Sequence, residues 1–188
     1  MTTAEMTREA EASEREEYIK RLEKLGTGEL AMLRRGCGER DPVEGRCPWL
    51  LNLIHGVASE ATAFLVASLL AQYKTQVIKA GRHRAEGNFG ATWKRAIAGT
   101  NSDSIKRRFH ILLDAQYDPW TGEGDLPHRL RQMVRYAAGK SVGVDWALLL
   151  RGLRSWNSPT KWVQKEWARA FFGREPEKAS TKSEVEKE

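Results

Sequence analysis

The residues of this chain best suited to chemistry are arginines and lysines that recur along helical segments between residues 102 and 172. In the segment 125–139, Arg131 and Arg135 point roughly away from an apolar stripe. One sign of charge on a helix face attracts polyanions, so the pattern predicts a basic binding surface. The apolar residues, which share about one third of the helical circumference, are Leu126, Leu130, Met133, Val134 and Ala137.

The segment 158–172 repeats this arrangement. Lys161, Lys165 and Arg169 lie opposite an apolar side that includes Trp167. An ordinary solvated helix face is the alternative interpretation, but such faces usually interleave both signs of charge to gain pairs four residues apart. Because one sign predominates here, we favour the binding surface.

The overall charge supports a polyanionic partner. The chain carries a formal net charge of +6, although residues 1–24 and 174–188 hold more acids than bases, so the middle of the chain is more basic still. Nucleic acid is the commonest polyanion that a soluble protein meets, and an anionic membrane is the competing partner. The most apolar stretch, 57–71, is short and interrupted by Glu60, which argues against membrane insertion.

We predict that the protein is not exported, because the chain does not begin with the basic segment and following apolar segment of a secretory signal peptide. Cys37 and Cys47 suit a reducing cytosol. We therefore expect a cytoplasmic protein. A zinc site would require both cysteines to meet His55, which their positions do not favour.

Enzymatic chemistry has little support. The chain lacks HExxH, CxxC, GxxxxGK[ST] and GxGxxG motifs. A calcium loop beginning at Asp114 is excluded because Pro119 interrupts it and the bidentate glutamate is missing. We interpret the acids around this loop as a turn followed by a helix N-cap at Asp125, and predict no catalytic residue, metal or cofactor. The acidic residues are Asp114, Asp118, Glu123 and Asp125.

The tryptophans divide into two groups. Trp146 and Trp167 lie on apolar stripes and are predicted to belong to the core. Trp120, in a turn, and Trp162, beside Lys161, remain open as surfaces on which bases could stack.

Helical periodicity and the absence of alternating β-branched runs predict an all-α chain of about eight helices and no sheet. Expected caps are Thr27, then Asn101 or Ser102, then Asp145, while Ser158 and Pro159 open the last helix. The expected helices are a docked helix from about Ser13, then 28–35, 49–55, 57–79, 91–98, one beginning near 102, 125–139, 146–156 and 158–172.

The chain resembles the CasB family, the small subunit of the type I-E CRISPR surveillance complex called Cascade. The likeness covers roughly residues 28–173, and the order of its pieces is more specific than any one of them. The pieces are GELAMLRRG at 28–36, NFGATW at 88–93, IKRRFHILL at 105–113, DLPHRLRQMVRYAAG at 125–139, VDWALLLRGLRSW at 144–156 and VQKEWARAFFG at 163–173.

The resemblance implies a non-enzymatic subunit of two small helical bundles packed together. Two copies would lie beside the guide crRNA and the target DNA strand, with other Cascade subunits as partners. The basic face would hold the opened R-loop, including the displaced strand. The expected organisation is a frayed extension at 1–12, an N-terminal helical subdomain at 13–100, a C-terminal helical subdomain at 101–173 and a disordered charged tail at 174–188.

The family's nucleic-acid contacts are carried over onto nine positions. The alternative is a protein-interaction scaffold whose basic faces meet partner subunits without touching nucleic acid. For Arg108, a stem packed on apolar surface is an equal alternative. The nine positions are Arg34, Arg35, Arg107, Arg108, Arg131, Arg135, Lys140, Lys161 and Lys165.

Overall fold

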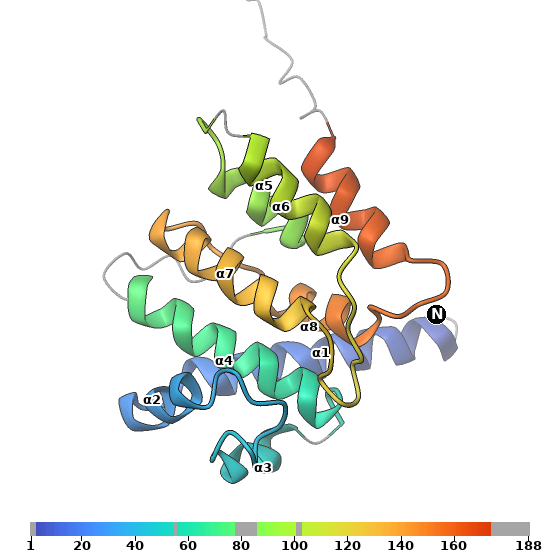
Figure 1. Cartoon of the computed structure of the whole chain (residues 1–188). Helices are drawn as coiled ribbons and strands as arrows, with labels where there is room; N and C mark the ends of the chain where they lie inside the picture. The colour runs from blue at the N-terminus through green and yellow to red at the C-terminus, as the bar shows by residue number, and fades with distance from the viewer. Residues whose placement is uncertain (1–2, 55, 78–85, 101–102, 174–188) are drawn as a thin grey trace, which may run out of the picture.

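The computed structural model describes residues 3–54, 56–77, 86–100 and 103–173, which form an all-α fold (Figure 1). Apart from an isolated bridge between Cys37 and Glu39, these residues contain no strand. The predicted all-α class without a sheet is confirmed. The elements are α1 (Thr3–Glu23), α2 (Thr27–Arg35), a 3₁₀ turn η1 (Pro48–Leu50), α3 (Leu51–Ile54), α4 (Glu60–Val77), α5 (Phe89–Ala96), α6 (Asp103–Leu113), α7 (Leu126–Gly139), α8 (Trp146–Arg154) and α9 (Trp162–Phe172).

Helix α4 is the centre of the fold. Every residue from Ala61 to Ala71 is buried, and α2, α7 and α8 pack around the helix (Figure 1). A helix that is apolar on all sides is stable in water only when other elements enclose it. The predicted central helix is therefore confirmed. Within the described residues, none of the helices has the length and apolarity that crossing a bilayer requires.

Helix α1 begins at Thr3, ten residues before the docked helix expected from about Ser13. Its first half is exposed, and only later residues such as Tyr18 enter the core, where the Tyr18 hydroxyl donates to the carbonyl of Ala63. Charged pairs four residues apart can maintain a solvated helix. The predicted extension at 1–12 is thus helical where the structure describes it, although it is undocked over most of its length.

Helix boundaries follow the predicted caps in part. Asp145 accepts from the amide of Leu148, as expected. Gly26, rather than Thr27, precedes α2, and its amide donates to the Glu29 carboxylate. Helix α9 begins at Trp162 because the residue before it has a left-handed backbone, so the start predicted at Ser158 and Pro159 is wrong.

Several expectations fall on residues outside the described ranges. They are the Asn101 or Ser102 cap, His55, the end of the central helix beyond Val77 and the charged tail at 174–188. The division into subdomains at residue 100 also stays a prediction. Helix α5, from the predicted N-terminal subdomain, packs against α9 and α7.

Helices α5 and α9 approach closely at Gly90. A Cβ built on Gly90 would lie 2.0 Å from the backbone oxygen of Trp167, so only glycine fits. Close by, the Trp167 ring packs on Phe89 and on Trp156, with centroids 5.3 and 5.2 Å away. Trp167 and Trp146 are each 2% exposed, which confirms their predicted place in the core.

The acid that precedes α7 follows the prediction in part. Asp125 holds the N-cap position, as predicted, but its side chain makes no capping hydrogen bond. Its carboxylate accepts from the Gln116 amide at 2.8 Å and from Arg129 Nε at 2.6 Å. Although burial acts to raise the pKa of Asp125, these hydrogen bonds and the Arg129 charge outweigh it and hold the pKa below its ordinary 3.8. Ionised Asp125 therefore ties the start of α7 to Gln116, in the segment that follows α6.

Replacing Asp125 with Asn should lower the free energy of unfolding by about 0.5–1 kcal/mol at pH 6, because charge-assisted hydrogen bonds are lost at a side chain that is 46% exposed and therefore screened by solvent. A carboxyl whose pKa is lowered by folding stabilises above its unfolded pKa and ceases to do so as the pH falls through its folded pKa. Urea denaturation should show the gap between wild type and variant closing below pH 4. Exposed Asp114→Asn serves as the control, and a gap independent of pH would contradict this role.

Gly90→Ala should destabilise the chain by about 1–3 kcal/mol, because α5 and α9 must separate to admit one methyl group. The matched control is Gly28→Ala in α2, where a Cβ meets nothing within 4 Å and alanine should stabilise slightly. Thermal melts of both variants provide the measurement. Equal melting temperatures would contradict the close contact.

Candidate nucleic-acid interface

Helix α7 presents the two arginines that the sequence favoured. Its leucines, together with Met133, Val134 and Ala137, are buried. The residues one turn apart on the other side are Arg131, which is half-buried, and Arg135, which is exposed. The predicted stripe is therefore confirmed, while the two guanidinium groups differ in their access to solvent.

Arg131 lines a recess rather than an open face. Its Nε is buried and has no hydrogen-bond partner within the described part of the chain. The recess, a cavity of about 400 Å³, lies between the 36–47 loop and the 117–124 turn. Glu39 and Glu123 line it together with Arg40, so the surroundings of Arg131 carry both signs of charge. Arg131 thus lies off the apolar stripe, as predicted, but in a recess of mixed charge, and its role as a phosphate contact stays a prediction.

A second recess lies at the end of α2. Arg35 is exposed there, and its Nε donates to the carbonyl of Ala31. Arg46 and Glu39 line the same cavity, and because Glu39 also lines the Arg131 recess, the two recesses are neighbours. The structure thus brings Arg35 close to the loop that borders Arg131. Its α2 neighbour, Arg34, is half-buried.

Arg40 and Arg46 are candidates that sequence reasoning missed. Both are exposed on the 36–47 loop. Helical periodicity, the pattern that distinguishes the other basic residues, has no meaning in a loop. The sequence feature that could have identified them is their positive charge in a glycine-rich loop that follows Arg34 and Arg35.

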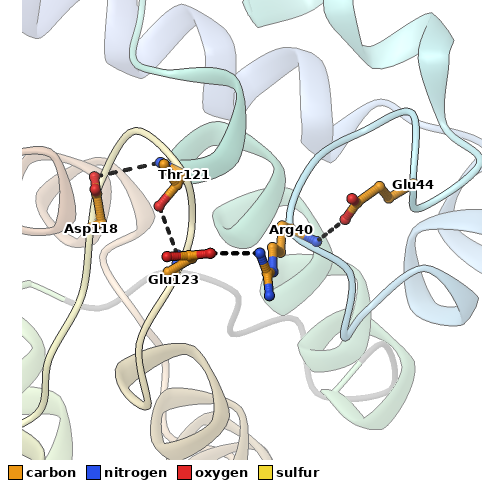
Figure 2. A network of polar contacts seen from close by, with 5 residues as sticks. All are labelled: Arg40, Glu44, Asp118, Thr121 and Glu123. Carbon is orange, nitrogen blue, oxygen red and sulfur yellow. Dashed lines mark hydrogen bonds and ion pairs between the residues drawn. The ribbon is translucent and has the colours of Figure 1, made fainter.

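The 36–47 loop and the 117–124 turn are joined by an ion pair. Arg40 Nη1 lies 2.7 Å from Glu123 Oε1, and the Arg40 amide donates to the Glu44 carboxylate (Figure 2). Both partners of the ion pair are more than half exposed, so the pair orients the loop more than it stabilises the fold.

Helix α6 carries Arg107 and Arg108, both exposed, while Phe109 and Leu112 face the core. Arg108 is exposed as a whole, which leaves open both the phosphate contact and the alternative of a stem packed on apolar surface. Phe109 packs against Phe171 of α9 with ring centroids 4.3 Å apart. The α6 arginines therefore lie beside α9 and away from α2.

The three predicted lysines are exposed as well. Lys140, just after α7, lies 5.9 Å from the centre of the Tyr136 ring. Lys165 is on α9, whereas Lys161 precedes that helix and lines a recess with Asp114 and Asp118. Because that recess also holds carboxylates, Lys161 is the least suited of the three to a phosphate.

The nine predicted positions do not gather into one compact site. Helices α2 and α9 lie at opposite ends of the molecule, with α4 and α7 between them (Figure 1). One group lies around α2, the 36–47 loop and α7, and the other lies on α6 and α9. Such a distribution suits an extended ligand that follows the surface rather than a small molecule. Among the described residues, no three His, Cys, Asp or Glu side chains are placed to hold a metal ion.

The remaining aromatic candidates differ in exposure. Trp162 is half-buried under Arg151, whose guanidinium lies 4.7 Å from its ring centre. This contact occupies one face of the ring. Trp120 is 79% exposed at the tip of the 117–124 turn.

Comparison with solved structures identifies the fold. CasB from Thermus thermophilus superposes with a TM-score of 0.66 at 27% identity, over 87% of this chain and 98% of that one. CasB of M. ruber gives a TM-score of 0.61, also at 27% identity, over 85% and 92%. A chain of a CRISPR RNA-guided surveillance complex gives 0.70 over 86% and 92%, and at 24% identity it shows the fold alone.

Sequence comparison agrees with the structural one. A Thermus thermophilus protein described as CRISPR-associated protein Cse2 is 36% identical over 124 residues, which are 65% of this chain. The aligned region spans 63% of the relative's own length. The family model described as CRISPR-associated protein Cse2 matches residues 29–172. The resemblance predicted from the ordered sequence pieces is confirmed, and the chain belongs to the Cse2 family, whose solved members also carry the name CasB.

Proposed function

We propose that this chain is a non-enzymatic small subunit of a type I-E CRISPR Cascade complex, which binds nucleic acid through basic surfaces and stabilises the R-loop during crRNA-guided antiviral DNA recognition. The observation that carries the proposal is the family match over residues 29–172. The fold shared with a chain of a CRISPR RNA-guided surveillance complex supports it. Partners would be both DNA strands, the guide crRNA, other Cascade subunits and a second copy, in the cytoplasm and without a membrane or a cofactor.

The energetics of an R-loop make phosphate contacts sufficient for this role. Replacing a DNA duplex with an RNA–DNA duplex is nearly balanced in free energy. A subunit that adds a few contacts to the opened strands can therefore decide whether the loop persists. Such contacts require exposed positive charge over an extended surface, as found on α6, α7 and the 36–47 loop.

Within the predicted set, exposure separates two roles. Arg35, Arg107 and Arg135 are exposed and can reach a phosphate directly. Arg131 would act in a recess where Glu39 is its neighbour, so a phosphate there must compete with that carboxylate. We assign the stronger phosphate contacts to the exposed arginines.

Reversing Arg135 to Glu should weaken binding of single-stranded DNA about tenfold, because an attractive contact becomes repulsive. Fluorescence anisotropy with a labelled oligonucleotide gives the affinity, and circular dichroism confirms that helicity is unchanged. Arg21→Glu on α1 produces the same change in net charge and serves as the control. An equal loss in both variants would mean that only net charge matters.

Binding should also weaken steeply between about 50 and 200 mM salt, since each neutralised phosphate releases counterions. Changing Arg107 and Arg135 together to Gln should reduce the slope of log K against log salt by about 1–2. The same anisotropy titration repeated across salt concentrations measures this. A flat salt response of the wild-type chain would refute phosphate binding.

The scaffold alternative has one observation in its favour. Carboxylates accompany several predicted contacts, as Glu39 does beside Arg131 and Asp114 beside Lys161. Mixed charge of this kind is typical of protein interfaces. Photo-crosslinkers placed at Arg107, Arg131 and Arg135 in the assembled complex distinguish the two: crosslinks to protein alone favour the scaffold, and crosslinks to nucleic acid favour the proposal.

A further inference from the structure

Trp120 is the most exposed large apolar side chain among the described residues, with 79% of its surface accessible. It occupies the tip of the 117–124 turn. An indole in water is costly, and tryptophan is among the residues that most often anchor protein interfaces. Neither the core nor the proposed phosphate contacts use Trp120.

The turn holds Trp120 in a fixed position. The Trp120 amide donates to Asp118 Oδ1 at 2.8 Å. The Gly122 amide donates to the Asp118 carbonyl at 2.9 Å, and the Asp118 amide donates to the Glu123 carbonyl at 2.8 Å. These three bonds close the turn on itself, so its backbone has little freedom to fold the indole back onto the chain.

The same turn is anchored to two other elements. The carbonyl of Pro119 accepts from Thr62 Oγ1, in the first turn of α4, at 2.7 Å and from Ser59 Oγ, just before that helix. On its other side, Glu123 is paired with Arg40 of the 36–47 loop (Figure 2). A side chain presented on an anchored turn loses little conformational entropy when it binds, which favours a docking role.

The charge around Trp120 selects the kind of partner. The stretch 114–125 contains four carboxylates and no lysine or arginine, although arginines outside it pair with two of the four, Glu123 and Asp125. Glu60 is exposed beside Ser59, which anchors the turn. An acidic rim repels the phosphates of a nucleic acid and attracts lysine or arginine. These surroundings therefore argue against base stacking by Trp120.

We propose that Trp120 anchors this chain to a neighbouring protein subunit by entering an apolar pocket whose rim carries lysine or arginine. The acidic residues of the turn meet that basic rim and set the orientation. The proposal deepens the proposed function, on which it rests for the identity of the neighbour, and it assigns protein docking to the tip of the 117–124 turn, next to the recess that Arg131 lines.

Trp120→Ala should weaken binding of the purified chain to a complex assembled from guide crRNA and the other Cascade subunits at least about tenfold. Trp120→Phe should retain part of the affinity, because a smaller ring fills part of the pocket. Biolayer interferometry measures both. Met6→Ala, which removes an exposed apolar side chain from α1, is the control and should bind as wild type does. Melting temperatures should not change, since Trp120 contributes little to the core.

Glu60→Gln tests the acidic rim separately, because it removes a charge outside the Arg40–Glu123 ion pair while keeping a side chain of the same shape. Its association with the complex should be several-fold slower than that of wild type, and the difference should shrink at high salt. Equal association rates at low salt would remove the acidic rim from the proposal.

Four other results would contradict the docking proposal. Wild-type affinity of Trp120→Ala for the complex overturns the docking proposal, while the Arg135 result on DNA stands independently. If Trp120→Ala instead loses oligonucleotide binding, the indole stacks on a base and the proposal is wrong. If it abolishes a dimer of the isolated chain with complex binding unchanged, the occupant is a second copy and the proposal is again wrong. Failure of the wild-type chain itself to bind the complex overturns the proposed function and this inference together.

Discussion

Helix α4 carries apolar or small side chains around most of its circumference. Exposing any side of it to water would therefore cost free energy. Burying the whole stretch from Ala61 to Ala71 requires neighbours on every side, and α2, α7 and α8 supply them. Each of these helices is itself amphipathic, so turning its apolar stripe toward α4 leaves its charged residues outside. The basic surfaces are a consequence of how the core is closed.

The same helix also positions the parts of the surface that are not helical. The buried hydroxyl of Thr62 bonds both the Pro119 carbonyl and the Tyr117 hydroxyl, at 2.7 and 2.9 Å. Burial raises the pKa of Tyr117 to about 12, so its hydroxyl stays protonated. A buried hydroxyl without a hydrogen-bond partner would destabilise the fold. The 117–124 turn therefore has to pack against Thr62. An irregular segment thereby gains a defined geometry from the core.

Most of the helices, the central position of α4 and the burial of Trp146 and Trp167 could be predicted, because each depends on the periodicity of apolar residues along a single segment. The errors lie where that periodicity does not apply. Periodicity predicts a start of α9 that is too early, because nothing local indicates the left-handed backbone of Lys161. The position of Asp125 before a helix predicts hydrogen bonds to the helix amides, whereas its carboxylate bonds Gln116 and Arg129.

The candidate site likewise has one part that local sequence predicts and one part that depends on packing. The positive charge on the outer faces of α6 and α7 could be predicted from the sequence. When the apolar stripe of a helix is buried, the residues on the opposite side of that helix are exposed together. The recess around Arg131 could not be predicted, because it is formed by Glu39 and Glu123 from segments distant in the chain. By itself, the sequence determined the helices, their amphipathic faces and the family, all of which depend on local order along the chain. Only the tertiary structure decided that Arg131 shares a recess with carboxylates and that Trp120 projects from an anchored turn. Both features depend on which distant segments the packing around α4 brings together.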